Sequence, residues 1–156
     1  MSDEPIFAVE LQVDGTPTPK GSMRAMMAAG RAILIPGGSK KNEKNLQSWD
    51  QAVRLAANQV CAGRSGPVFV DEPIELEIQF RLPRPAGHWA KRGGLKPSAA
   101  PFPHRKPDLD KLVRATADSL RGTVYDDDAR IVGQIVRKMY AGPGNEGAFI
   151  VVRRVR

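Results

Sequence analysis

Apolar and polar positions alternate along two segments of the chain and predict half-buried β-strands there. In residues 6–13 and, more regularly, in residues 74–82, apolar side chains occupy alternate positions. Because successive side chains of a strand point to opposite faces, each segment would place one face on a core. Three less regular apolar segments complete the predicted strands: residues 32–35, 131–139 and 148–155.

Apolar residues at helical spacing predict two helices. In residues 42–62 they recur every three or four positions, and Trp49 falls on their inward stripe. The second helix would begin after Asp108, a good N-cap residue, and run to residue 121. The resulting order, β-β-α-β-α-β-β, predicts an α+β fold with two helices on a single layer of mixed sheet. We find no repeat or linker, so residues 1–156 are predicted to form one domain.

Residues 83–107 form a predicted loop of unusual length and composition. The loop holds six of the chain's 13 prolines, and loops this long in compact domains are usually functional or disordered. Its aromatic residues Trp89 and Phe102 could stack on unpaired bases, but coverage of the core is the favoured interpretation. His88 and His104 have no nearby Cys or second carboxylate, so a zinc site is not predicted.

Charge is distributed unevenly along the chain, which carries a net charge of +7. Residues 15–45 contain six cationic side chains and one acid, and residues 83–107 contain six cationic side chains and no acid. Residues 108–128 reverse the pattern, with six aspartates against three cationic side chains. The net charge alone suggests an anionic partner, and the two basic segments suggest where phosphates would bind.

A single cysteine, Cys61, excludes an internal disulfide and an all-Cys zinc site, which fits a reducing compartment. No apolar run approaches the length of a membrane span, and the acidic N-terminus lacks the apolar core of a signal peptide. The sequence therefore predicts a cytoplasmic protein.

The aspartate-rich segment predicts a site for a hard divalent cation. Asp108 and Asp110 straddle the start of the second helix, and Asp110, Arg114 and Asp118 follow at steps of four along it. If residues 126–128, three consecutive aspartates, fold back against this stripe, several carboxylates surround one point. Such a cluster is costly without a cation, and Mg²⁺ prefers oxygen ligands.

Each part of this pattern also has a purely structural interpretation. Asp108 could be a plain N-cap, Asp110 and Arg114 a surface ion pair, and residues 126–128 a turn. Their occurrence together beside a basic loop favours a site. A calcium-binding EF-hand loop is excluded, because Leu112 and Val113 stand where it requires an oxygen ligand and a glycine.

Three spaced motifs follow one another in the second half of the chain: KPDLDKLVR at residues 106–114, DSL at residues 118–120 and DDARI at residues 127–131. Together they resemble the RusA family of Holliday-junction resolvases. The glycine- and proline-rich segment 15–24 also resembles phage-type members. The resemblance covers most of the chain and leaves out the loop 83–107.

The resemblance implies a homodimeric, Mg²⁺-dependent endonuclease of phage or prophage type, with Mn²⁺ as a substitute metal. Such an enzyme cuts four-way DNA junctions by paired symmetric nicks, leaves 5′-phosphate ends and serves recombination and repair. By position, Asp108, Asp110 and Asp128 match the metal ligands. Asp118 and Asp127 match accompanying acids, and Asp127 is counted with the predicted metal ligands. Arg114 stands at the catalytic lysine of the family.

Two departures from the family pattern concern cations near these acids. Lys111 replaces an asparagine, and Arg114 replaces the lysine with a planar, forked cation. The predicted DNA-binding residues are Lys20, Arg24, Lys91, Arg92, Lys96, Arg105, Lys106, Lys111 and Lys138. Two alternatives remain open at this point: a catalytically silent junction- or duplex-binding protein, and a small carboxylate-metal enzyme that acts on nucleotides.

Overall fold

The computed structural model describes residues 6–21 and 23–156, without the side chains of residues 23, 24, 35 and 36. Eight regular elements follow one another in the order β-β-β-α-β-α-β-β. They are β1 (Ala8–Asp14), β2 (Met23–Ala28), β3 (Arg31–Pro36), α1 (Lys40–Val60), β4 (Ile74–Leu82), α2 (Leu109–Leu120), β5 (Ile131–Tyr140) and β6 (Gly147–Arg154), with short 3₁₀ turns η1 (Ala86–His88) and η2 (Asp128–Arg130).

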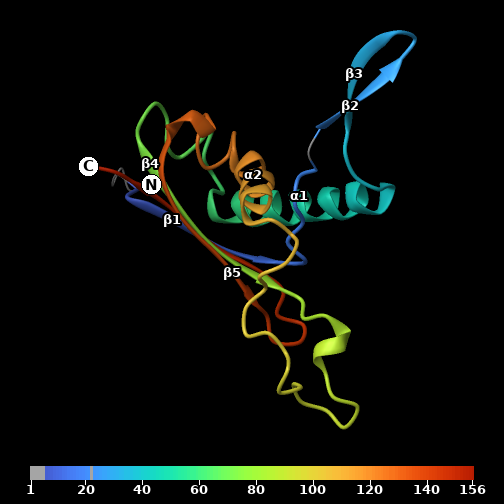
Figure 1. Cartoon of the computed structure of the whole chain (residues 1–156). Helices are drawn as coiled ribbons and strands as arrows, with labels where there is room; N and C mark the ends of the chain where they lie inside the picture. The colour runs from blue at the N-terminus through green and yellow to red at the C-terminus, as the bar shows by residue number, and fades with distance from the viewer. Residues whose placement is uncertain (1–5, 22) are drawn as a thin grey trace.

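Four strands form the main sheet in the order β1-β6-β4-β5. The β1–β6 and β6–β4 pairs are antiparallel, whereas β4 and β5 run parallel. Both helices lie on the same side of this twisted sheet (Figure 1). The predicted α+β architecture, with two helices on one layer of mixed sheet, is thus confirmed.

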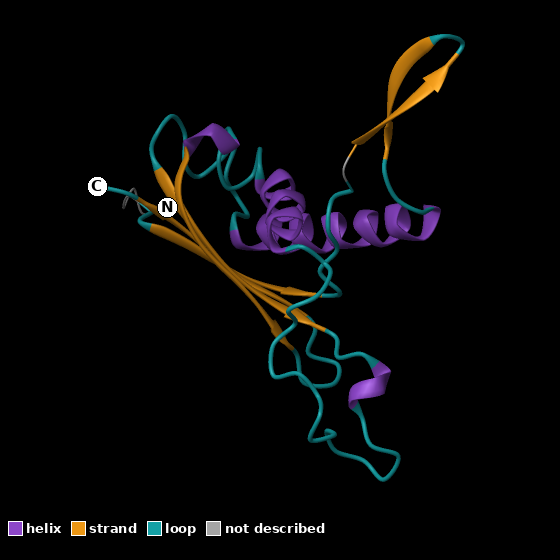
Figure 2. Cartoon of the chain, viewed as in Figure 1, coloured by secondary structure: helices purple, strands orange, loops and turns teal. Residues whose placement is uncertain are grey.

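The sequence pattern missed one strand, β2, which pairs with β3 in a separate hairpin. Its run of methionine and alanine residues shows no alternation between apolar and polar positions, so nothing marked it as a strand. Ala29 and Gly30 form the turn, and both have positive φ angles, 49° and 73°, as tight hairpin turns require. The hairpin projects away from the helices and the main sheet (Figure 2).

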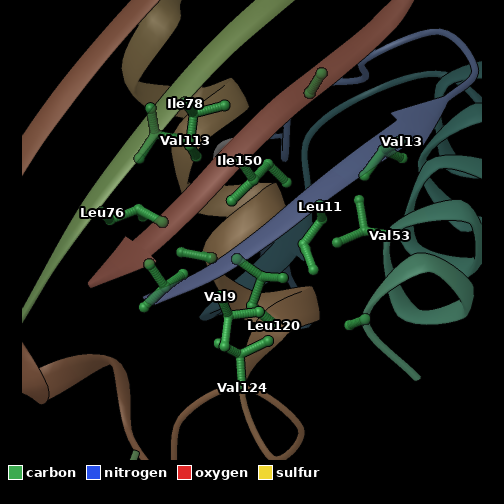
Figure 3. Close-up of a cluster of buried hydrophobic side chains, with 14 of the residues drawn as sticks. Val9, Leu11, Val13, Val53, Leu76, Ile78, Val113, Leu120, Val124 and Ile150 are labelled. Carbon is green, nitrogen blue, oxygen red and sulfur yellow. The ribbon is translucent and has the colours of Figure 1, made fainter. Parts of the chain in front are cut away.

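The core lies between the helices and the main sheet. The alternate residues of β4, from Ile74 to Leu82, are at most 4% exposed. Leu112 and Leu120 of α2 are fully buried in the same cluster. Figure 3 shows Leu120 beside Val9 of β1, and Val53 of α1 beside Leu11 and Val13 of β1. The faces that the sequence pattern predicted to point inward, on residues 74–82 and on both helices, are therefore the faces that are buried.

A buried hydrogen bond joins the two helices. The indole N–H of Trp49, predicted to be a core residue and only 2% exposed, donates to the hydroxyl of Thr116 over 3.1 Å. That hydroxyl in turn donates to the backbone carbonyl of Leu112 over 2.9 Å. The pair fixes α2 against α1 at the middle of the helix that carries the acidic motif.

None of the described helices combines the length and the apolar character needed to cross a bilayer.

Replacing Thr116 by valine should lower the free energy of unfolding by about 1–3 kcal/mol, because the buried indole N–H of Trp49 loses its acceptor. Urea denaturation of the purified protein measures the difference. Ser48→Ala is the matched control, because the Ser48 hydroxyl bonds only to its own helix on an exposed side. Equal stabilities for Thr116→Val and the control would contradict the role given to this bond.

Candidate active site

Helix α2 has an apolar face toward the core and a charged face toward solvent. Asp110, Arg114 and Asp118 lie one turn apart on the charged side, while Leu112, Thr116 and the rest of the inward stripe are buried. Residues four positions apart are neighbours on a helix surface. Packing of the apolar face therefore sets the direction in which the three charged side chains project.

A groove with a volume of about 570 Å³ runs between α2 and the start of β5. Asp110, Arg114 and Asp118 line one side, and Asp128 joins them from η2. Residues 131–134 of β5 form the other side. The structure thus brings together three of the predicted acids and the predicted catalytic cation, although residues 118 and 128 are separated by a complete chain reversal.

Tyr125 anchors this reversal. Its hydroxyl donates to the backbone carbonyl of Ala117 over 2.6 Å, and its side chain is fully buried. Burial, reinforced by the negative charges of Asp128 and Asp118, raises the pKa of this hydroxyl, which therefore remains a donor. The backbone N–H of Asp126 donates to the carbonyl of Phe69, so the acidic turn is held on both sides.

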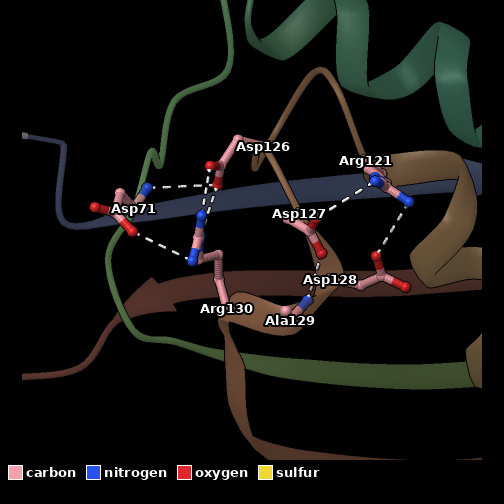
Figure 4. A network of polar contacts seen from close by, with 7 residues as sticks. All are labelled: Asp71, Arg121, Asp126, Asp127, Asp128, Ala129 and Arg130. Atoms are coloured by element: carbon pink, nitrogen blue, oxygen red, sulfur yellow. Dashed lines mark hydrogen bonds and ion pairs between the residues drawn. The ribbon is translucent and has the colours of Figure 1, made fainter.

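The three consecutive aspartates have different partners (Figure 4). Asp126 accepts two hydrogen bonds from Arg130, which lower the pKa of its carboxyl group. Asp127 accepts from the backbone N–H of Ala129 over 2.9 Å and thereby caps η2. Of the three, Asp128 is the one that lines the groove.

Arg121 compensates the charge of this turn and was not singled out by the sequence. Its guanidinium lies 3.4 Å from a carboxylate oxygen of Asp127 and 3.6 Å from one of Asp128 (Figure 4). Arg130 similarly bridges Asp126 and Asp71. No periodicity relates Arg121 to these acids, because it lies at the end of α2 and they follow a turn.

Asp110 and Arg114 are the two groove residues whose charges remain available. Neither forms an ion pair with any described residue, so the surface pair that their spacing also allowed is not formed. Asp118, by contrast, pairs with Lys20. The groove thus holds one unpaired carboxylate and one unpaired guanidinium that are adjacent on the same helix face.

Asp108 lies in a neighbouring groove with a volume of about 350 Å³, which Lys20, Lys106 and Lys111 also line. It occupies the N-cap position of α2 but accepts no capping hydrogen bond through its side chain. Its carboxylate is 3.4 Å from the ammonium of Lys111. The structure therefore places Asp108 beside, and not within, the groove that holds Asp110.

The groove chemistry fits a hydrated divalent cation. Within residues 6–21 and 23–156, no three His, Cys, Asp or Glu side chains are grouped closely enough to form a metal cage. Mg²⁺ does not require one, because it keeps several waters and is usually held by one or two carboxylates together with substrate phosphates. Asp110 and Asp128, on an open and water-accessible groove, supply such a donor set.

Lys138 contacts the protein backbone. Its ammonium donates to the carbonyl of Arg105 over 2.7 Å and to that of Pro107 over 2.8 Å. It was predicted to bind DNA, but in this structure it holds the end of the loop directly before Asp108. The backbone N–H of Lys20 secures the other side of this region by donating to the carbonyl of Lys111 over 3.1 Å.

The remaining predicted DNA-binding cations are dispersed. Lys91, Arg92 and Lys96 are exposed in the proline-rich loop and line neither acidic groove, and Arg105 is exposed near its end. Arg24 belongs to β2, but its side chain lies outside the described part of the structure.

The expectation that Trp89 and Phe102 cover the core is wrong. Phe102 is 66% exposed, and Trp89 is half-buried outside the core cluster. The loop instead builds its own contacts around Tyr140, at the end of β5. Composition could not reveal this, because an apolar side chain in a long loop is equally compatible with either location.

Replacing Lys138 by methionine should expose the segment before Asp108 to trypsin, because the ammonium that holds two of its carbonyls is lost. We expect cleavage after Arg105 to accelerate severalfold, measured by mass spectrometry during limited proteolysis. Arg137→Met is the matched control, since Arg137 is exposed on the same strand. Unchanged cleavage in Lys138→Met would show that these bonds do not hold the loop.

Comparisons with known proteins show what this chain is similar to. Uncharacterized protein YqaN of Bacillus subtilis (strain 168) is 24% identical over 141 residues, which cover 85% of this chain and 88% of that protein. A crystal structure of the protein Atu1372 from Agrobacterium tumefaciens, of unknown function, covers 86% of this chain and 74% of its own, with 13% identity and a TM-score of 0.38. The family model described as Endodeoxyribonuclease RusA matches residues 14–152, which include both acidic grooves. The chain therefore belongs to the RusA family of endodeoxyribonucleases.

Proposed function

We propose that this protein is a Mg²⁺-dependent, structure-selective endonuclease that resolves four-way DNA junctions. The observation that carries the proposal is the adjacent pair of unpaired charges, Asp110 and Arg114, in a groove that also contains Asp128. Membership of the RusA family supports a nuclease and makes branched DNA the first substrate to test.

Asp110 and Asp128 would hold the metal ion, with Asp108 reached through bound water or phosphate. A bound Mg²⁺ would supply an activated water and offset the charge that develops on the 3′ leaving oxygen of the phosphodiester. Asp127, which was predicted among the metal ligands, has a different part in this proposal. Through its pairing with Arg121 it fixes the turn that presents Asp128.

Arg114 would bind the non-bridging oxygens of the scissile phosphate. A guanidinium can donate two parallel hydrogen bonds to a phosphate, and it acts most strongly where negative charge accumulates in the transition state. Because Arg114 is exposed and has no acidic partner among the described residues, it reaches a phosphate without breaking an ion pair.

The cations around the two grooves would hold the flanking phosphates. Lys20, Lys106 and Lys111 line the Asp108 groove, so a strand placed across both grooves meets positive charge on one side of the reactive phosphate. The exposed loop cations Lys91 and Arg92 would contact phosphates farther along. Such contacts make affinity strongly dependent on salt.

We also propose that the protein acts as a homodimer. One chain presents one groove with Asp110 and Arg114, whereas paired nicks across a two-fold symmetric junction require two sites related by the same symmetry. Two copies of the chain supply them.

The Asp110→Asn variant should lose cleavage of a synthetic four-way junction in Mg²⁺ by at least about 10²-fold, a size typical for removal of one group that stabilises charge in the transition state. Binding of the junction should be retained, because removing a negative charge does not weaken contacts with phosphate. Gel assays of cleavage and of binding measure both. Asp14→Asn, an exposed aspartate on the edge strand β1, is the control and should cut normally.

The Arg114→Ala variant should reduce the cleavage rate by about 10²–10³-fold, while Arg114→Lys retains most of it because the positive charge remains. Single-turnover rates at saturating protein separate this effect from binding. Equal loss in both variants would indicate that the planar fork, and not the charge, is essential. Full activity in Arg114→Ala would exclude the proposed role.

A catalytically silent junction-binding protein is the second candidate. The contact between Lys111 and Asp108 favours it, because a cation against a potential metal ligand weakens metal binding. Incubation of wild-type protein with a junction in Mg²⁺, Mn²⁺ or EDTA separates the two functions. Nicks that require a divalent metal establish the nuclease, and binding without product in all three buffers establishes the silent protein.

A further inference from the structure

The proline-rich loop encloses a second cavity that the proposed cleavage chemistry does not use. Its volume is about 490 Å³, within the size range of small-molecule sites of about 300–1,000 Å³. The loop lies at the end of the sheet away from the β2–β3 hairpin (Figure 1), where the parallel strands β4 and β5 both end. The cavity walls come mainly from the loop, with Leu82, Tyr140 and two residues of the segment after β1.

The loop around this cavity is fixed by polar and aromatic contacts. The guanidinium of Arg84 lies 4.3 Å from the centre of the Tyr140 ring and donates to the carbonyl of Ala100 over 2.9 Å. The imidazole of His88 meets the same ring edge-on, with ring centres 5.4 Å apart. Two residues from the start of the loop thus contact one aromatic ring, and Arg84 ties residue 100 to them, so these contacts hold the cavity walls without a ligand.

The chemistry of the walls suits a planar, partly polar molecule with an attached anion. Prolines, Leu82 and the Tyr140 ring provide apolar surface, while Thr16, Ser98, His88 and His104 provide hydrogen-bonding groups. Arg105 and Lys106 add positive charge, and none of the described residues that line the cavity is acidic. A nucleobase with its phosphate combines these properties, because its faces are apolar, its edges form hydrogen bonds and its phosphate is anionic.

The cavity adjoins the groove that contains Asp108. Lys106 and Pro107 line both this cavity and the groove that contains Asp108. Lys138 holds the carbonyl of Pro107 and thus fixes their common wall. A strand with one base in the cavity would therefore have its neighbouring phosphates beside Asp108 and the lysines around it.

From these contacts we infer that the cavity under the proline-rich loop binds one unpaired nucleobase of a DNA strand. The inference rests on the proposed action on branched DNA, whose branch point offers the bases that are least costly to unstack. Capture of a base would position the strand relative to Asp108 and give the loop a role in the choice of substrate. A free mononucleotide has the same chemistry and is the other possible source of the base.

The test uses four-way junctions with a single 2-aminopurine at each position next to the branch point in turn. The fluorescence of this base rises when it leaves the stack, and the whole protein is added in EDTA to prevent cutting. Wild-type protein should raise the fluorescence severalfold at one position. Ser98→Trp places into the cavity an indole similar in size to a nucleobase. This variant should still bind the junction, but its fluorescence rise should be less than half of that with wild-type protein.

Leu95→Trp is the matched control, because it adds the same indole to an exposed position of the same loop outside the cavity. Excitation at wavelengths beyond tryptophan absorption keeps the readings comparable. His104→Leu, another exposed wall position, is a second variant that should also reduce the rise. No rise at any position, or equal rises in Ser98→Trp and Leu95→Trp, would overturn the inference.

Two further measurements separate the possible outcomes. In the first, deoxyadenosine monophosphate is added while the junction remains bound. If the fluorescence rise is lost, the cavity accepts a base from a free mononucleotide as well as from the strand. If the rise persists, the cavity accepts the strand base alone. Wild-type protein that cuts in Mg²⁺ but gives no rise refutes the base site and leaves the nuclease proposal intact. A rise in a protein that never cuts refutes the nuclease proposal and leaves the base site intact.

Discussion

The division of α2 into a buried face and a charged face is the constraint on which the candidate site depends. Leu112, Thr116 and Leu120 cannot leave the core without exposing apolar surface or breaking the bond to Trp49. The helix therefore cannot rotate, and Asp110 and Arg114 must project together into the groove beside β5. Burial of the apolar face of α2 thus determines which charged side chains face the groove.

Carboxylates this close in sequence and space repel one another, and the structure balances most of them with nearby cations. Lys20, Lys111 and Arg121 neutralise acids on both sides of the groove, and Arg130 neutralises the far end of the acidic turn. Asp110 is left without such a partner among the described residues. In the proposed site, this uncompensated negative charge would attract a metal ion.

The sequence predicted the helices and strands correctly wherever an element is buried on one face and exposed on the other, because its apolar residues then repeat at the spacing of that element. The alternation of β4 and the stripe of α2 describe surfaces that are buried on one side, so their inward faces were correct. Strand β2 was missed because both faces of its hairpin are largely exposed, as at Met27. Its sequence therefore does not alternate between apolar and polar residues. Phe102 was misplaced because an apolar residue in a long loop carries no pattern that says whether its side chain faces the core or solvent.

By itself the sequence determined the secondary structure that carries the acids, the spacing of the acids, and the two basic segments that precede them. It could do so because helix and strand patterns depend on neighbours within a few positions. Only the tertiary structure decided that Asp128 lines the same groove as Asp110 and that Arg121 forms an ion pair with Asp127. It likewise decided that Lys138 donates hydrogen bonds to the backbone just before Asp108. These contacts cross chain reversals, where distance in sequence no longer limits distance in space.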